Sequence, residues 1–318
     1  MTISIITPCY NEEANIPAFF DEIRKVRKQL PDDVLTELLF VDDGSSDNTY
    51  PLISGLAGSN AWVRYIRFTR NFGKEAAMLA GLEAAAGDYV AIMDADLQDP
   101  PSLIPEMYRR ITAGDYDRIA TRREDRKGEP VLRSFAARQF YRLINKVSDV
   151  KIVDGARDFS MMSRRMVNSV LELKERSRFT KGIFEWPGYK TDWISFPNRE
   201  RSGGNTKWSF WKLFRYSIEG IVSFSSLPLT ISSLIGIALC FLSLLLIVFV
   251  IVKKLVFGDP VAGWPSLVCI ILLVSGLQHL CVGILGTYLA RVFTEIKNRP
   301  MYVVLDSNVE RKDTSGSP

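Results

Sequence analysis

A short apolar run that ends in two carboxylates constrains this chain more than any other stretch. Residues 89–93 are rich in Val, Ala and Ile, which predicts a buried strand, and Asp94 and Asp96 follow at once. Ligands of an open α/β sheet bind beyond the carboxyl ends of its strands, so we expect both carboxylates to face a crevice. With Gln98 they offer the oxygen ligands that Mg²⁺ or Mn²⁺ prefers. The alternative is an isolated Asp-x-Asp in a solvated turn.

Strands and helices alternate before this run. Each expected crossover is long enough for a helix, and parallel strands need such crossovers. We therefore expect an α/β fold, a mostly parallel sheet with helices on both faces, and a first strand that stops at Pro8. The expected elements are strands at 3–7, 37–41 and 63–68 and helices at 15–30 and 73–86.

Two common phosphate-binding motifs are absent from the sequence. No Gly-x-Gly-x-x-Gly follows the first expected strand and no Gly-x-x-x-x-Gly-Lys-Ser/Thr occurs, which argues against a dinucleotide dehydrogenase and a P-loop NTPase. The single histidine, His279, excludes any mechanism that needs two histidines. A formal net charge of +4 is too small to indicate a nucleic-acid partner. A sheet that ends its strands in acids is instead expected to hold a diphosphate through a metal ion.

Charge is unevenly distributed along the chain. Residues 227–252 and 264–290 carry no Asp, Glu, Lys or Arg, and each is longer than the ~20 residues that span a bilayer. They predict a transmembrane hairpin in an integral membrane protein. More Lys and Arg flank the hairpin than its turn, so the first part and both termini are expected in the cytoplasm. The expected division is an α/β domain at 1–207, an amphipathic interfacial segment at 208–226, two membrane helices at 227–290 and a C-terminal strand and tail at 291–318.

Four motifs in a fixed order carry a resemblance to a known family. They are Thr7–Glu12, Val41–Asp47, Arg70–Lys74 and Asp94–Pro100. Together they resemble family 2 glycosyltransferases, and they are most similar to the polyprenyl-phosphate group, which includes dolichyl-phosphate mannose synthases and bactoprenol glucosyltransferases. The similarity covers nearly the whole chain. It implies a GT-A type sheet that binds a nucleotide sugar.

The resemblance also implies roles for individual residues. Asp94, Asp96 and Gln98 would hold Mg²⁺ or Mn²⁺ on the donor diphosphate. The residues that would bind the nucleotide sugar are Pro8, Tyr10, Asn11, Glu12, Asp42, Lys74, Asp94, Ala95 and Asp96. Those that would bind the lipid phosphate are Arg122, Arg133, Arg138, Arg201 and Lys207. For Asp42 and its neighbour Asp43 the alternative is a pair of turn-forming acids.

The expected catalytic set is Asp96, Asp158, Arg122, Arg201 and Lys207. Many family 2 enzymes use an acid near position 158 to deprotonate an acceptor hydroxyl. A lipid phosphate has a second pKa of about 6 and needs no strong base. Asp158 therefore has three open roles, as a base, as an orienting group or as an ion-pair partner of Arg157. Residues 201–207, with two glycines and two cations, favour a lid, and the alternative is a linker into the membrane.

These features predict an enzyme that transfers a hexose to undecaprenyl or another polyprenyl phosphate, with inversion at the anomeric carbon. UDP-glucose as the donor rests on the resemblance alone. The alternatives are a processive or other-acceptor family 2 enzyme and a membrane-anchored nucleotide-sugar sensor without turnover. Expected partners are the nucleotide sugar, the polyprenyl phosphate and membrane lipid. Further candidates are a second copy of the chain, paired through a strand at 300–305, a flippase and a downstream transferase.

Overall fold

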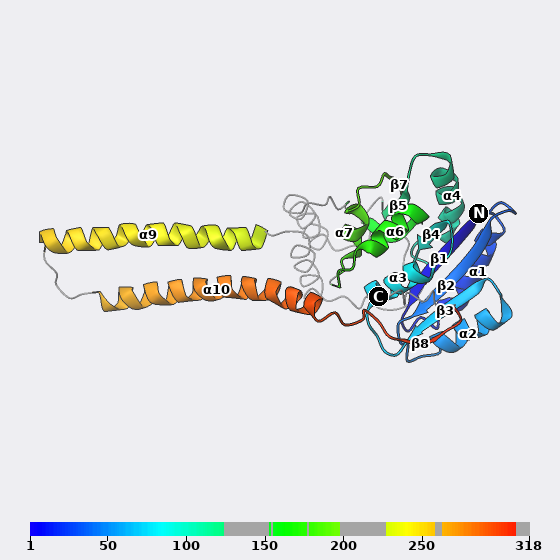
Figure 1. Ribbon diagram of the computed structural model, residues 1–318, viewed down its shortest axis with the longest axis horizontal. Helices are drawn as coiled ribbons and strands as arrows, with labels where there is room; N and C mark the ends of the chain where they lie inside the picture. The colour runs from blue at the N-terminus through cyan, green and yellow to red at the C-terminus, as the bar shows by residue number, and fades with distance from the viewer. Residues whose placement is uncertain (124–152, 154, 177, 198–226, 258–262, 310–318) are drawn as a thin grey trace, which may run out of the picture.

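The computed structural model describes residues 1–123, 153, 155–176, 178–197, 227–257 and 263–309. The strands are β1 (Thr2–Cys9), β2 (Leu35–Asp42), β3 (Val63–Phe68), β4 (Tyr89–Ile92), β5 (Arg118–Arg123), β6 (Ala156–Ser163), β7 (Thr191–Phe196) and β8 (Val304–Ser307). The helices are α1 (Ile16–Arg27), α2 (Thr49–Ser59), α3 (Lys74–Ala84), α4 (Ile104–Ala113), α6 (Arg164–Glu172), α7 (Thr180–Glu185), α9 (Leu227–Phe257) and α10 (Trp264–Ile296). Figure 1 shows a sheet domain from which α9 and α10 project.

Among these residues the strands form one eight-stranded sheet in the order β7-β5-β6-β4-β1-β2-β3-β8. The pairings of β1 with β2 and β4, of β2 with β3, and of β5 with β7 are parallel. The pairings β3–β8, β4–β6 and β5–β6 are antiparallel. The predicted α/β fold with a mostly parallel sheet is therefore confirmed.

Helices cover both faces of this sheet because side chains alternate along its strands. Ile3 and Ile5 of β1 pack on one face with α1, α2 and α4, and Ile6 packs on the other with α3, α6 and α7. Gly81 lets α3 lie directly against β1, since a Cβ at Gly81 would stand 2.2 Å from Cγ2 of Ile6. The helix that follows β3 thus begins at the carboxyl edge of the sheet, with Lys74 as its first residue.

The first strand does not stop at Pro8, as the sequence predicted. It runs on to Cys9, and its pairing with β2 continues through Pro8↔Val41. Its pairing with β4, on the other side, has already ended at Ile6. A proline without an N–H is tolerated here because β1 has only one neighbour left at that point.

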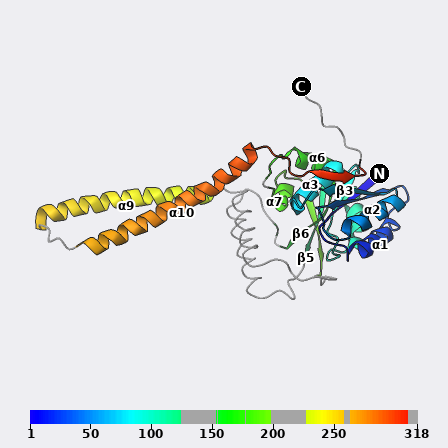
Figure 2. The same ribbon diagram turned by 90° about the horizontal axis from the view of Figure 1, so that it is seen from below.

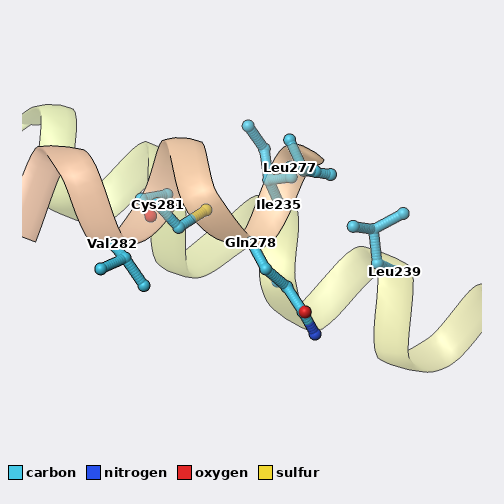
Figure 3. A pocket seen from close by; sticks show the side chains of 8 residues that line it. Ile235, Leu239, Leu277, Gln278, Cys281 and Val282 are labelled. Atoms are coloured by element: carbon cyan, nitrogen blue, oxygen red, sulfur yellow. The ribbon is translucent and has the colours of Figure 1, made fainter. Parts of the chain in front are cut away.

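The two long helices α9 and α10 run side by side away from the sheet (Figures 1 and 2). Within the described residues, Leu273–Ile296 of α10 is long and apolar enough to cross a membrane, judged by length and composition. A hollow of about 440 Å³ lies between the two helices (Figure 3). Its labelled lining residues are Ile235, Leu239, Leu277, Gln278, Cys281 and Val282. This lining carries no formal charge, so the hollow does not suit a diphosphate.

The C-terminal strand returns to the sheet of its own chain. Ile66 of β3 pairs with Ser307 of β8, and Arg67 with Asp306, in antiparallel register. The ring of Tyr302 also stacks on Phe68, with ring centroids 4.8 Å apart. The sequence placed a strand at 300–305 and paired it with another subunit. The exposed edge of β3 explains the difference, because its unpaired backbone groups accept the nearest extended segment.

Candidate active site

Several acidic residues meet at one edge of the sheet. Asp42 is the last residue of β2, and Asp94 follows β4 by two residues. The antiparallel strand β6 begins at this edge, and its register with β4 pairs Ile92 with Ser160. The same register, extended by two residues, sets Asp158 across from Asp94. Acids that are far apart in the sequence therefore face one another.

The ammonium group of Lys74 joins two of these acids. Its Nζ lies 2.7 Å from Oδ1 and 2.8 Å from Oδ2 of Asp94, and 2.5 Å from Oδ2 of Asp158. Burial alone would lower the pKa of Lys74, but Asp158 and Asp94 raise it well above its usual range. Burial raises the pKa of Asp158, and Lys74 and then Lys181 outweigh that effect and hold it far below its usual range. Asp158 is therefore ionised at neutral pH.

Residues 96–99 form a tight turn beneath this group. The backbone N–H of Gln98 donates to Oδ1 of Asp96 at 3.1 Å. The side-chain oxygen of Gln98 accepts from Arg123 at 3.0 Å and from Arg157 at 3.4 Å. Arg157 also donates to the buried carboxylate of Asp99, with 2.8 Å between Nε and Oδ1. The sequence left open a pairing of Arg157 with Asp158, and the structure instead pairs Arg157 with Asp99 and Asp158 with Lys74.

The loops after β1 and β2 are bound to each other. The side-chain oxygen of Asn11 accepts from the N–H of Ser46 at 2.9 Å, and the N–H of Asn11 donates to Oγ of Ser45 at 3.0 Å. Asn11 adopts a positive φ of 54°, which asparagine tolerates better than most residues. Tyr10 precedes it with 42% of its surface exposed. The ring of Tyr10, one of the predicted nucleotide-sugar-binding residues, is thus accessible and stands on a fixed loop.

Asp43, the neighbour of Asp42, has a structural role. A turn-forming role was the alternative that the sequence left open for both acids. Its carboxylate accepts from the N–H groups of Phe72 at 2.7 Å and Gly73 at 2.9 Å. Burial raises the pKa of Asp43, and the hydrogen bonds from Phe72 and Gly73 oppose that effect. Asp43 therefore fixes the loop that leads into α3 and to Lys74.

Gly44 packs against the same loop, and its substitution should be strongly destabilising. It has a φ of +69°, and a Cβ there would stand 2.4 Å from the backbone carbon of Arg70. We expect Gly44→Ala to reduce the stability of the sheet domain by about 2–4 kcal/mol, from left-handed strain and a backbone clash. The matched control is Gly55→Ala in α2, where a Cβ meets nothing within 4 Å. Urea denaturation followed by tryptophan fluorescence checks both, and equal midpoints for the two variants would contradict the expectation.

Two further residues near Asp158 were not singled out from the sequence. Glu75 is the second residue of α3, and burial, followed by the charge of Asp158, raises its pKa to about 8. It therefore carries a proton for most of the time at neutral pH. Lys181 of α7 donates to the backbone oxygen of Ala156 at 3.0 Å. Only the fold brings α3, α7 and β6 together, so no local sequence signal marks this cluster.

The arginines predicted to bind phosphate are only partly described. Arg122 lies near the end of β5, and its Nε donates to Oγ of Ser195 on β7 at 2.9 Å. Its guanidinium is therefore at the same sheet edge as the acids. The other predicted cations, Arg133, Arg138, Arg201 and Lys207, and the interfacial segment at 208–226 lie outside the described residues.

The acids at this edge suit a hard divalent cation. Asp94 and Asp96 supply two carboxylates from one turn, and the contact of Asp94 with Lys74 shows that this carboxylate already holds a positive charge. Among the residues that the structure describes, no three His, Cys, Asp or Glu side chains form a closed metal cage. Mg²⁺ commonly binds through one or two carboxylates with substrate phosphates and water, so the donor set fits such an ion.

Comparisons with known proteins agree over most of the chain. Residues 4–171 match the family described as glycosyl transferase family 2. The SfII prophage-derived bactoprenol glucosyl transferase of Shigella flexneri is 42% identical over 308 residues, which cover 97% of this chain and 99% of that protein. The putative glycosyltransferase CsbB of Bacillus subtilis (strain 168) is 40% identical, over 98% of this chain and 93% of that protein.

Similarity to solved structures is weaker. A glucosyl-3-phosphoglycerate synthase from Mycobacterium tuberculosis, in complex with Mn²⁺, uridine-diphosphate and glucosyl-3-phosphoglycerate, is 20% identical with a TM-score of 0.44. The match covers 70% of this chain and 77% of that one.

Proposed function

The chain belongs to glycosyl transferase family 2, and we propose that it transfers glucose from UDP-glucose to a polyprenyl phosphate at a membrane surface. One observation carries the proposal. Asp42, Asp94 and Asp158 converge at one sheet edge, in a chain that aligns over 97% of its length with a bactoprenol glucosyl transferase. The convergence supports a diphosphate-sugar donor, and the relative supports the sugar and the lipid acceptor.

The donor nucleotide would bind over the first two loops. Tyr10 offers an exposed ring for stacking on the base, and Asp42 offers a buried carboxylate that can accept from imide or ribose donors. Asn11 and Glu12 hold the loop in place, since the N–H of Glu12 donates to Oγ1 of Thr49 at 2.8 Å. Pro8 and Ala95 would border the nucleotide through the backbone.

The diphosphate would lie beside Asp94 and Asp96. A Mg²⁺ or Mn²⁺ ion held by these carboxylates would offset the negative charge that develops on the leaving diphosphate. Lys74 already balances the charge of Asp94 and Asp158, and its removal would leave two facing carboxylates without the cation that contacts both. Gln98 is the third predicted ligand, and it would have to exchange its contacts with Arg123 and Arg157 for the ion.

The transfer step needs little help with proton removal. An oxygen of the lipid phosphate attacks C1 of glucose, the bond from C1 to the diphosphate oxygen breaks, and UDP leaves with the electron pair. The attacking phosphate is largely a dianion at neutral pH, because its second pKa is about 6. The strongly lowered pKa of Asp158, set by Lys74 and Lys181 against burial, makes it a weak base. We therefore assign Asp158 the role of an orienting group, with catalysis by positioning and charge stabilisation.

The acceptor lipid calls for a membrane-bound enzyme. We propose that α9 and α10 both span the bilayer as a hairpin, with the sheet domain and both termini on the cytoplasmic side. The uncharged stretches at 227–252 and 264–290 and the flanking cations support this arrangement. Arg122 at the sheet edge, with Arg133, Arg138, Arg201 and Lys207, would then bind the lipid phosphate where it enters the crevice.

Sealed inverted membrane vesicles that contain the protein test the proposal. They are given polyprenyl phosphate, Mg²⁺ and one of several radiolabelled nucleotide sugars, and the label in the organic phase is measured. We expect UDP-glucose alone to label lipid, without permeabilisation of the vesicles, because inverted vesicles expose the cytoplasmic face. Chelation of divalent cations with EDTA should abolish the labelling.

The other outcomes separate the alternatives. Label from a different donor would replace glucose but keep the transferase. Donor binding without any lipid label would favour the nucleotide-sugar sensor or a different acceptor. Labelling that requires permeabilised vesicles would place the sheet domain on the opposite side of the membrane.

A further inference from the structure

Within the part of the chain that the structure describes, the carboxylate of Asp42 pairs with one cation. One oxygen, Oδ1, accepts from the N–H of Ser45 at 3.0 Å. The other, Oδ2, is buried, and no hydrogen bond from the described residues reaches it. Its nearest counter-charge is Nε of Arg67, at 3.4 Å. The position of Arg67 therefore decides how firmly the free oxygen of Asp42 is held and how strongly its charge is balanced.

Arg67 in turn is held by a residue of α2. Its guanidinium carbon lies 4.1 Å from the ring centroid of Tyr50, a cation–π contact. The ring of Tyr50 also meets the ring of Tyr65 edge to face, with centroids 5.7 Å apart. The side chain of Arg67 is 29% exposed, so its position depends on contacts such as this one with the ring of Tyr50.

The C-terminal strand holds Tyr50. The hydroxyl of Tyr50 donates to Oδ2 of Asp306 on β8, and the hydroxyl of Tyr65 donates to the same oxygen at 3.0 Å. These two hydrogen bonds lower the pKa of Asp306, which keeps it an anionic acceptor. Asp306 also stands directly across from Arg67 in the β3–β8 register. A continuous set of contacts thus runs from β8 through Tyr50 and Arg67 to Asp42.

We propose that Asp306 and Tyr50 are positioning residues for the donor-binding carboxylate Asp42. The inference rests on the proposed function for the role of Asp42 at the nucleotide. β8 follows α10 through residues 297–303, and Glu295 near the end of α10 accepts from the N–H of Arg176 at 2.9 Å. The C-terminal arm, defined as residues 297–307, therefore connects the second long helix to the strand that carries Asp306.

The physical consequence is specific to the nucleoside part of the donor. Without Asp306, Tyr50 loses its acceptor and no longer fixes Arg67. Asp42 then loses its counter-charge and its orientation toward the base and ribose. The diphosphate, in contrast, binds at Asp94 and Asp96 on a different loop, which this set of contacts does not reach.

Calorimetric titration of the full-length protein in detergent tests the proposal. The titrants are UDP and inorganic pyrophosphate, each with Mn²⁺. For Asp306→Ala we expect the dissociation constant of UDP to rise about threefold to tenfold, which is the net contribution of a typical hydrogen bond, with that of pyrophosphate unchanged. Tyr50→Phe should act in the same direction, and Asp306→Asn, which keeps an acceptor oxygen, should restore most of the affinity. In transfer assays, the KM for UDP-glucose should rise while kcat stays the same.

Tyr302→Phe is the matched control on the same arm. It removes the hydrogen bond from Tyr302 to Glu83, which is not connected to Asp42, and keeps the stacked ring. UDP affinity in this variant should equal that of the wild type. Equal weakening in Tyr302→Phe, or equal weakening of pyrophosphate in Asp306→Ala, would overturn the inference and leave β8 a purely structural strand.

A failure of the proposed function would give a different result in the same titrations. If the wild-type protein binds UDP no more tightly than pyrophosphate, the nucleoside role of Asp42 is wrong and the inference falls with it. If the wild type prefers UDP and Asp306→Ala keeps the full preference, only the inference falls.

Discussion

Glucose transfer by Asp96→Asn is expected to be at least about a hundredfold slower than transfer by the wild type. Asparagine keeps the size of the side chain and one oxygen, so the turn can keep the hydrogen bond from the N–H of Gln98. The substitution removes one of the two negative charges from the turn that would hold the cation. The initial rate of lipid labelling measures the loss of transfer. Electron paramagnetic resonance of bound Mn²⁺ in the presence of UDP should show a matching loss of metal affinity.

The control for this change is Asp88→Asn, at the other end of the same strand. The carboxylate of Asp88 accepts from the N–H of Thr2 at 2.8 Å, and asparagine can keep that bond. Both variants lose one acid from a segment that flanks β4, but only Asp96 stands at the carboxyl edge of the sheet. Comparable losses in the two variants would mean that general destabilisation, not metal binding, explains the effect. A wild-type rate in Asp96→Asn would contradict the metal assignment.

Much of the fold could be predicted because local patterns of apolar residues in the sequence indicate its strands and helices. The alternation that buries Ile3, Ile5 and Ile6 on opposite faces is visible in the sequence, and the expected strand at 63–68 agrees with β3 in both bounds. The position of Asp42 and Asp94 at strand ends follows from the same patterns. Because parallel strands end at a common edge, the convergence of these acids could be inferred before any coordinates were known.

The partners of these acids could not be predicted, because they depend on register between distant strands. Asp158 reaches Lys74 only because β6 enters the sheet antiparallel to β4, and no local signal sets that direction. The neighbouring Arg157 was an obvious partner for Asp158 by sequence, yet adjacent side chains on a strand point to opposite faces. Arg157 accordingly pairs with Asp99.

The C-terminal strand illustrates the same limit. Its existence was predicted from an extended apolar run, but a sequence does not show which sheet edge is exposed. β3 offers that edge within the same chain, and the pairing places Asp306 beside Arg67. The contacts that connect the C-terminal arm to Asp42 are therefore a property of the tertiary structure alone.

Lys74→Met should reduce transfer at pH 7.5 by about tenfold to a hundredfold, because an opposite charge at the reacting edge is lost. Methionine approximates the length of the lysine side chain but cannot balance Asp94 and Asp158, whose oxygens lie within 2.8 Å of the same nitrogen atom. The two carboxylates would repel each other and move apart. Lys25→Met is the matched control, since Lys25 pairs with Glu22 at 2.6 Å on the exposed surface of α1. That pair should contribute little, and its loss should leave transfer unchanged.

The pH profile of Lys74→Met provides the sharper test. In the wild type the pKa of Asp158 lies far below its usual value, because Lys74 and Lys181 outweigh burial, so Asp158 stays ionised throughout the acidic limb. Lys74 is the largest of the charges that oppose burial, so its loss raises the pKa of Asp158, and Asp158 takes up a proton at higher pH. The acidic limb of kcat/KM should therefore move to higher pH by about one unit or more.

The stability of Lys74→Met relative to the wild type should also depend on pH. A carboxylate whose pKa is lowered in the folded protein stabilises the fold at pH values above the pKa that it has in the unfolded chain. That contribution is lost as the pH falls through the folded pKa. In Lys74→Met we expect burial to raise the pKa of Asp158 above its value in the unfolded chain, so that its ionised form destabilises the fold at neutral pH and acidification relieves this cost. The apparent melting temperature of Lys74→Met should thus lie further below that of the wild type at pH 7.5 than at pH 5. In the double variant Lys74→Met/Asp158→Asn this pH dependence should disappear, whereas a deficit that is equal at both pH values would show that Lys74 acts only by packing.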